Sequence, residues 1–595
     1  MLLLAGIAAP FVPAADQTPP ADLILHHGRI ATVDDSFRVE AAVAVRAGRV
    51  VAVGPDERIL ALRGPATEVV DLEGRLVLPG LFDTHVHAAD ASVTEFDHPI
   101  PPMETLADVL AYIRERAERS PEGSWIEVRQ VFITRLAEQR YPTRAELDAA
   151  APRHAVLFAT GPDASLNSLA LRLSGIDRDF RVTDGGSGFA EKDPGTGEPT
   201  GILRNCTRYV KVVSSRRTPT LDERVARLVD LFADYNAVGI TSICDRDTGV
   251  DDVEVFREWR RRGAPTVRVS LSEHIESIGP LASVETAIRR VADDPLFRER
   301  DPWLRVIGVK TYLDGGMLTG SAYMRAPWGV SRIYSITDPE YRGVRFIPQE
   351  RLVAMVRASV GAGLQFTAHS VGDGAVQALL DAYETVNRER PVRSTRPCIS
   401  HSNFLSREAI DQAARLGVLV DIQPAWLWLD THTLLAQFGY DRLRYFQPLR
   451  SLFAAGVVAS GGSDHMQKIG ALRAVNPYHP FLGMATAVTR TAKRHPSPLH
   501  PEEALDREQG IRFYTRNGAI LAGRDDELGS IQPGKLADLI LLDTDLLTCP
   551  PDRIAATRVL RTWVNGRQVH PRLDGRSAAA GASRPRGDGT SSSSR

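Results

Sequence analysis

Length, composition and charge already exclude several kinds of protein. The chain has 595 residues, of which 43% are hydrophobic and 25% are charged, which is typical of globular proteins and too apolar for a disordered chain. Its 72 Lys and Arg residues nearly balance 74 Asp and Glu residues, so no basic surface for nucleic acid is expected. The four Cys residues lie far apart, which excludes a cysteine zinc ribbon and a disulfide-dense scaffold and fits a reducing compartment.

The two ends of the chain differ in composition from the rest. Residues 1–21 are apolar and then rich in small residues, like the core and cleavage region of a signal peptide. They carry no Lys or Arg, however. They predict either a truncated signal peptide of an exported protein or a disordered leader of a cytoplasmic one. Residues 571–595 are rich in Gly, Ser, Ala and Arg and predict a disordered tail. No window reaches the roughly 20 consecutive apolar residues of a membrane span.

Two blocks of short apolar strands lie far apart in the sequence, at residues 22–77 and 525–570. In the second block, Asn565 and Gly566 form a typical two-residue hairpin turn. Each block alone has too few strands for a stable core. We therefore expect the two blocks to pair into one small β-sandwich, with everything between them inserted.

The inserted residues 78–524 alternate strand and helix patterns, which predicts an α/β fold with a (β/α)₈ TIM barrel. An open doubly wound sheet gives the same alternation, but no glycine-rich phosphate turn follows the first strand. About 120 residues separate the first two strands, and their own helices and strands predict a lid-like insertion at about residues 98–220. The predicted strands are Leu78–His87, Gly239–Asp247, Thr266–His274, Leu304–Asp314, Leu364–Val371, Pro397–Phe404, Val418–Gln423 and Val457–Asp464.

Polar residues gather where these strands end. His85 and His87 lie two apart, so on a strand both imidazoles point to one face, at the end of the barrel where active sites lie. Two such imidazoles suit Zn²⁺, Mn²⁺ or Fe²⁺. Alone, the pair is a weak signal.

The other strand ends supply further residues of the same kind. The intervals from His369 to His401 and from there to Asp464 correspond to about one and two βα units. Lys310 precedes His369 by one unit plus an insertion. Each residue alone has an ordinary explanation, such as a core histidine, a paired lysine or a helix cap. All of them together at one rim predict a metal site.

These residues lie in motifs that resemble a known family. The stretches LVLPGLFDTHVH, VKTYLDGG, HSVGDGA, GGSD and ELGSIQPGKLADLILLD follow one another in order between about residues 22 and 569. In kind and order they resemble the metal-dependent amidohydrolase superfamily, in particular the family 3 branch, which includes N-substituted formamide deformylases. The stretch around His401 departs from the family pattern, with Ser-His-Ser-Asn in place of Glu-His-Ala-Gln. The resemblance therefore does little to identify the substrate of this chain.

The resemblance implies a centre of two divalent metals, with two Zn²⁺ expected and Mn²⁺ or Fe²⁺ as alternatives. One metal would be held by His85, His87 and Asp464, and the second by His369 and His401. Lys310 would bridge them as a carbamate formed with CO₂. A single metal with an uncarboxylated Lys310 stays open as a variant.

The resemblance also implies a reaction. A hydroxide shared by the metals would attack the carbonyl carbon of an amide, N-formyl or cyclic amide group, and Asp464 would move the proton. The chain would then be a hydrolase of non-peptide C–N bonds in a small molecule, with a homodimer as a common family state. The alternatives are a non-catalytic binding or regulatory protein on this scaffold, and a hydrolase of esters or phosphoesters.

Six further residues are candidate substrate contacts. Two of them end the third predicted strand, and the others lie beside the ligand motifs or supply an aromatic wall that would favour an apolar substrate. They are Glu273, His274, Asp314, Tyr323, Trp426 and His465. For any single residue of the aromatic wall, ordinary packing between the barrel and its loops is a better explanation than a specific contact.

Overall fold

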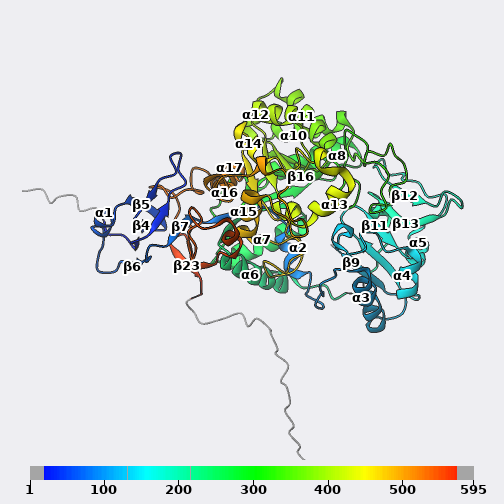
Figure 1. Cartoon of the computed structure of the whole chain (residues 1–595), viewed down its shortest axis with the longest axis horizontal. Helices are drawn as coiled ribbons and strands as arrows, with labels where there is room; N and C mark the ends of the chain where they lie inside the picture. The colour runs from blue at the N-terminus through cyan, green and yellow to red at the C-terminus, as the bar shows by residue number, and fades with distance from the viewer. Residues whose placement is uncertain (1–18, 130, 215, 573–595) are drawn as a thin grey trace, which may run out of the picture.

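The computed structural model describes residues 19–572, except residues 130 and 215 (Figure 1). The predicted leader as far as residue 18, and the predicted tail from residue 573, lie outside the described residues. Within these ranges, no helix has the length and apolar character that a bilayer crossing demands.

Eight parallel strands form the centre of the molecule, in the order β20-β19-β18-β17-β16-β15-β14-β8. The sheet closes on itself, since Thr84 Oγ1 donates to the carbonyl of Gly461 at 3.0 Å and Asp464 N donates to the carbonyl of His85 at 2.7 Å. The predicted (β/α)₈ barrel is confirmed. Its strands are β8 (Leu81–Val86), β14 (Ile240–Thr248), β15 (Arg268–His274), β16 (Leu304–Tyr312), β17 (Gln365–Ser370), β18 (Cys398–His401), β19 (Leu419–Ile422) and β20 (Ala459–Gly461).

Helices between the strands cover the outside of the barrel. Helix α6 (Leu221–Ala237) shows why they form: Thr220 and Glu223 make a reciprocal capping box at its start, which satisfies backbone N–H groups. Leu228 and Leu231 then face the core at helical spacing. The corresponding helices are α7 (Val250–Arg262), α8 (Leu281–Asp293), α10 (Gln349–Gly361), α11 (Asp373–Asn387), α12 (Arg407–Leu416) and α14 (Leu449–Ala454).

Both ends of the described chain build one β-sandwich, as predicted. Strand β7 pairs antiparallel with β21, with Leu78 opposite Ile540. Leu25 and Val43 of one sheet and Leu539 and Trp563 of the other share a core. One sheet has β5 (Arg49–Gly54), β4 (Ala42–Arg46), β1 (Leu23–His26) and β6 (Glu68–Asp71); the other has β23 (Arg567–His570), β22 (Val559–Val564), β21 (Leu539–Leu542), β7 (Leu76–Pro79), β2 (Arg29–Ala31) and β3 (Val39–Glu40).

The long segment between β8 and α6 has its own five-stranded sheet, which Figure 1 shows at the end of the molecule opposite the β-sandwich. Phe132 and Val128 from this segment share a core with Leu318 and Trp426, which follow barrel strands. The segment therefore covers the carboxyl ends of the strands. Its elements are α3 (Leu106–Arg119), β9 (Trp125–Arg129), α4 (Arg144–Ala150), β10 (Ala155–Ala159), β11 (Ala164–Leu166), α5 (Ser168–Ser174), β12 (Phe189–Lys192) and β13 (Pro199–Arg204).

Candidate metal centre

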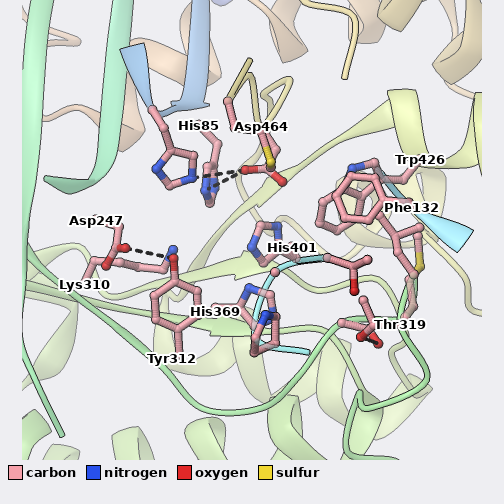
Figure 2. A pocket seen from close by; sticks show the side chains of 18 of the residues that line it. His85, Phe132, Asp247, Lys310, Tyr312, Thr319, His369, His401, Trp426 and Asp464 are labelled. Carbon is pink, nitrogen blue, oxygen red and sulfur yellow. Dashed lines mark hydrogen bonds and ion pairs between the residues drawn. The ribbon is translucent and has the colours of Figure 1, made fainter. Parts of the chain in front are cut away.

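A cavity of about 240 Å³ lies at the carboxyl ends of the barrel strands (Figure 2). Residues of the inserted segment, including Phe132 and Gly161, also line this cavity. We name it the catalytic cavity. All six residues that the sequence predicts as metal ligands line it, namely His85, His87, Lys310, His369, His401 and Asp464.

Each of these residues stands at or near the end of a strand. His85 lies in β8, Lys310 in β16 and His369 in β17, while His87 directly precedes helix α2 (Ala88–Val93). His401 ends β18 with φ 79°, and Asp464 follows β20 with φ 56°. Such left-handed backbone is strained for residues other than glycine and clusters at functional sites.

One group of donor atoms is ready for a metal. Nε2 of His87 lies 3.2 Å from Oδ1 of Asp464, and Nε2 of His85 lies 3.5 Å from the same oxygen. The donor atoms of this trio all lie within 4.8 Å of one another. Nε2 of His85 is buried and has no hydrogen-bond partner among the described residues. A buried orphan nitrogen beside a carboxylate fits a metal ligand, since it would otherwise cost free energy.

The remaining ligand candidates continue the cluster. The imidazole of His401 lies 4.6 Å from that of His85 and 4.4 Å from that of His369, between ring centroids. Lys310 is buried in the wall of the same cavity, with Nζ 5.1 Å from the ring centroid of Tyr312. The donor set of nitrogen and oxygen atoms suits Zn²⁺ and its neighbours in the first transition row.

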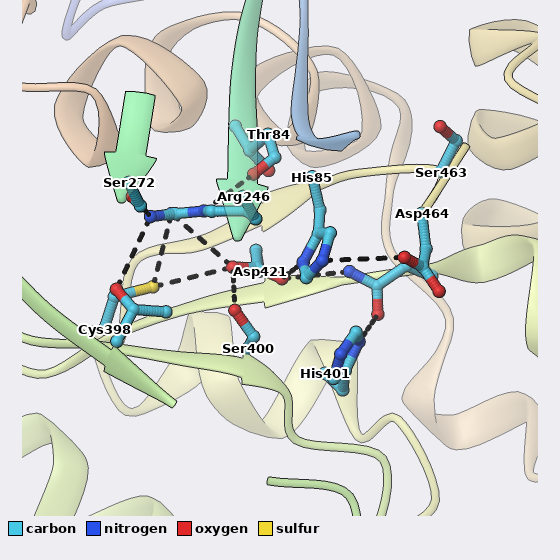
Figure 3. Close-up of polar contacts among 12 residues, drawn as sticks. Thr84, His85, Arg246, Ser272, Cys398, Ser400, His401, Asp421, Ser463 and Asp464 are labelled. Carbon is cyan, nitrogen blue, oxygen red and sulfur yellow. Dashed lines mark hydrogen bonds and ion pairs between the residues drawn. The ribbon is translucent and has the colours of Figure 1, made fainter. Parts of the chain in front are cut away.

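The side chains behind the imidazoles fix which nitrogen faces the cavity (Figure 3). Nδ1 of His85 donates to Oδ1 of Asp421 at 2.7 Å, and Nδ1 of His401 donates to Oε1 of Gln423 at 2.8 Å. Both rings therefore keep the lone pair on Nε2 for a metal. The second oxygen of Asp421 accepts from Ser400 at 2.9 Å and lies 3.5 Å from the buried guanidinium of Arg246. We therefore assign Asp421 an orienting role, although its oxygens also lie within ligand distance of His85 and His401.

Burial shifts the pKa of most of the cluster, and His87 is the exception, because Asp464 raises its pKa against the effect of burial. Burial lowers the pKa of His85, of His401 and of Lys310, and that of His369 falls to about 3. Neutral imidazoles are the form that binds metals. Burial also raises the pKa of Asp464, against the opposing effect of His87.

Of the six predicted substrate contacts, Trp426 lines the catalytic cavity and stacks on His401 with ring centroids 4.8 Å apart. His274 lies just outside, where its Nδ1 donates to Asp247 at 2.7 Å. Glu273 faces helix α8 instead and pairs with Arg290 at 3.1 Å.

The other three also lie outside this cavity. The carboxylate of Asp314 accepts the backbone N–H groups of Val371, Gly372 and Tyr323, so it braces two loops. His465 is buried, 2.8 Å from Tyr235 Oη and 2.7 Å from the carbonyl of Lys468. Asp314, His465 and Tyr323 do not line the catalytic cavity, although Oδ1 of Asp314 lies 3.9 Å from Nε2 of His369.

Sequence reasoning missed Asp247 and Tyr312 on the cavity wall. Asp247 ends the second predicted strand, so the rule that found the ligands could have found it as well. Its Oδ2 accepts a hydrogen bond from Tyr312 Oη at 2.8 Å. Asp421 and Gln423 were missed inside the seventh predicted strand, where their alternation points them into the barrel.

The fold and the site together define the class of this chain. It is a TIM-barrel protein whose candidate metal centre is a cluster of imidazoles and carboxylates at the carboxyl end of the barrel. The profile of the amidohydrolase family matches residues 68–570, and the chain belongs to that family. The N-substituted formamide deformylase of Arthrobacter pascens is 29% identical over 562 residues, which cover 92% of this chain and 98% of that protein.

One further relative agrees with this assignment, and one solved structure shares the fold. The putative amidohydrolase YtcJ of Bacillus subtilis strain 168 is 25% identical, covering 92% of this chain and 99% of that protein. The crystal structure of an uncharacterized metal-dependent hydrolase from Pyrococcus horikoshii OT3 superposes with a TM-score of 0.64 at 20% identity, covering 89% of this chain and 99% of that one. This likeness shows the shared fold.

Proposed function

We propose that the protein is a metal-dependent hydrolase that cleaves a non-peptide C–N bond, in an amide, N-formyl or cyclic amide group of a small molecule. The observation that carries the proposal is that six residues of ligand type, from five strand ends, line one small cavity. The orphaned Nε2 of His85 supports it, because a bound metal would supply the partner that this buried atom lacks. The similarity to a formamide deformylase over 98% of its length favours this substrate class.

His85, His87 and Asp464 would hold one metal, and His369 and His401 a second one. When bound, the metals would polarise the substrate carbonyl and make a hydroxide available at neutral pH. Lys310 would join the two as a carbamate, for which its amine must be uncharged. Burial, which lowers the pKa of Lys310, favours that uncharged form.

Asp464 is the proposed proton carrier. Its Oδ1 lies 3.2 Å from Nε2 of His87 and 3.5 Å from Nε2 of His85. Nδ2 of Asn476 lies 3.4 Å from Oδ2 of Asp464 and donates a hydrogen bond to the backbone carbonyl of Asp464 at 2.8 Å. The raised pKa of this buried carboxyl suits a group that takes a proton and returns it. Asp464 would accept the proton during attack on the carbonyl carbon and deliver it to the nitrogen as the C–N bond breaks.

The cavity has two unlike sides, as Figure 2 shows. Phe132 and Trp426 lie on one side, with Met317 also in the lining. Asp247 and Tyr312 lie on the opposite side, near Lys310. With a volume of about 240 Å³, it accommodates a small reacting group that carries an apolar substituent.

The proposal is tested with purified protein and a panel of N-formyl amines, N-acyl amines, cyclic amides, esters and phosphoesters. We expect release of amine from the formamides or amides, abolished by Asp464→Asn. Turnover of esters or phosphoesters alone would contradict the substrate class, and no turnover by metal-loaded protein would contradict the function.

A further inference from the structure

A second cavity, of about 560 Å³, adjoins the catalytic cavity. Phe132 lines both of them, so the two cavities meet at this residue. In Figure 2, Phe132 lies on the side of the catalytic cavity away from Tyr312. Five cationic side chains and one carboxylate line the second cavity, so we name it the cationic cavity. The lining therefore carries an excess of positive charge, although the formal net charge of the chain is −2.

Lys468 is the key residue of the cationic cavity, because it is only 8% exposed. Its Nζ donates to the carbonyl of Pro101 at 3.4 Å, and no carboxylate of the described residues lies within 4.0 Å of it. Glu95 is the carboxylate that acts on it, but Arg473 binds both oxygens of Glu95, at 2.7 and 2.9 Å. A buried ammonium without its own counterion is costly. An anion in this cavity would remove that cost.

The backbone holds Lys468 in place. Its N–H donates to Thr94 Oγ1 at 2.9 Å, and its carbonyl lies 2.7 Å from Nε2 of His465. With φ 69°, it keeps a left-handed conformation that is strained for a lysine. The loop that follows Asp464 thus presents the ammonium at a fixed place beside the catalytic cavity.

The other cations of the lining differ in how far they are already paired. Arg135 binds Asp430 at 2.9 Å and is used by the fold. Lys493 and Arg494 are exposed, and Lys493 lies 4.0 Å from Glu104, which leaves its charge largely available. Lys468 with these two rim residues therefore forms a positive field that opens to solvent.

Apolar side chains complete the walls of the cationic cavity. They include Met103, Trp428 and Leu472, the last of which is 66% exposed. A purely inorganic anion would leave this surface in water. The lining fits a carboxylate or phosphate carried on an apolar group.

We propose that the cationic cavity binds the anionic end of the substrate through Lys468, while the scissile C–N bond lies in the catalytic cavity. The position of the scissile bond in this proposal rests on the proposed function. The substrate class is then an N-acyl or N-formyl amine whose amine part ends in a carboxylate or phosphate. Phe132, which lines both cavities, would then lie between the scissile bond and the anionic end of the substrate.

The test compares N-formyl ω-amino acids of increasing chain length with N-formyl alkylamines of equal length. At one length, the kcat/KM of the carboxylate should exceed that of its neutral partner by about tenfold or more, because a charged hydrogen bond forms in a buried place. Lys468→Met should remove this preference, Lys468→Arg should retain part of it, and the exposed Lys211→Met should leave it intact. Met is close in length to Lys and apolar, so the buried variant is expected to fold.

A second measurement separates the inference from the proposed function. Inorganic phosphate and hexanoate, at constant ionic strength, should raise the melting temperature of the wild type more than that of Lys468→Met. Turnover with equal kcat/KM for charged and neutral substrates at every length overturns the inference. Equal stabilisation of wild type and variant by both anions overturns it as well, even if no substrate of the panel is hydrolysed. A third outcome is stabilisation by anions that depends on Lys468, without any preference for charged substrates. The cationic cavity would then bind an anion other than the substrate, which contradicts the proposed role in substrate binding.

Discussion

Asp421 Oδ1 lies 2.7 Å from Nδ1 of His85, and both side chains are fully buried inside the barrel although 336 residues separate them. The contact decides which nitrogen of His85 can bind a metal. Ser400 and Arg246 hold the second oxygen of Asp421, so the carboxylate cannot turn away. A chain of buried contacts thus runs from the middle of the barrel to the candidate metal centre (Figure 3).

Asp421→Asn should weaken metal binding by about 10- to 100-fold, because the amide is a poorer partner for the imidazole N–H and can present its own NH₂ to that N–H. Competition with a chelator measures the affinity, and excess Zn²⁺ should restore activity. Asp411→Asn, on the surface helix α12, is the control. Unchanged affinity in the Asp421 variant would show that its role is confined to folding.

Lys310→Met should lose one of two metals, since Met cannot form the bridging carbamate. Reconstitution of the metal-free wild type should be faster with bicarbonate, and the variant should not respond to it. Metal content by mass spectrometry is the readout. Two metals retained in Lys310→Met would refute the bridging role and leave Lys310 as a positioning residue.

Phe132→Ala should open the catalytic cavity toward the cationic cavity, because Phe132 lines both of them. The kcat/KM for bulky N-formyl amines should rise relative to that for small ones, while total activity falls as the cavity admits water. Phe132→Leu should have a smaller effect, and Phe189→Ala, outside the catalytic cavity, should have none. An unchanged size preference in Phe132→Ala would contradict this assignment.

Glu146 gives the stability a pH dependence. The hydrogen bond from Arg140 at 2.7 Å holds the pKa of Glu146 at about 2, against a usual value of 4.5. The ionised form therefore stabilises the folded chain above pH 4.5, and this contribution disappears as the pH falls toward 2. Glu146→Gln should lower the free energy of unfolding by about 1 kcal/mol at pH 7, since the residue also caps helix α4.

The difference in melting temperature between wild type and Glu146→Gln should shrink steadily below pH 4.5. Glu118→Gln, on the exposed face of α3, is the matched control and should show no such trend. A difference that stays constant down to pH 3 would mean that the Arg140 contact does not act through the charge of Glu146.

The barrel and the six ligand candidates could be predicted because both depend on local patterns. Strand periodicity sets the faces of His85 and His87, and the length of a βα unit sets the spacing from His369 to His401. The partners of these residues depend on contacts across the barrel. Asp421 contacts His85 only after the sheet closes, so the sequence around Asp421 does not predict its role.

The misplaced substrate candidates show the same limit. Glu273 and His274 are adjacent on one strand, so their side chains point to opposite faces and only one can approach the centre. Asp314 lies in the right region, but three backbone N–H groups take up its carboxylate. Whether a polar group is free for a ligand depends on loop contacts that sequence spacing does not contain.

If the six ligand candidates hold metal for hydrolysis, metal content and activity must change together. The direct measurement is metal content by inductively coupled plasma mass spectrometry, on protein reconstituted with Zn²⁺ or Mn²⁺, together with amine release from a formamide. We predict about two metals per chain, and a parallel loss of metal and activity on chelation. Less than about half a metal per chain, with activity that survives chelation, would contradict metal-dependent hydrolysis at this site.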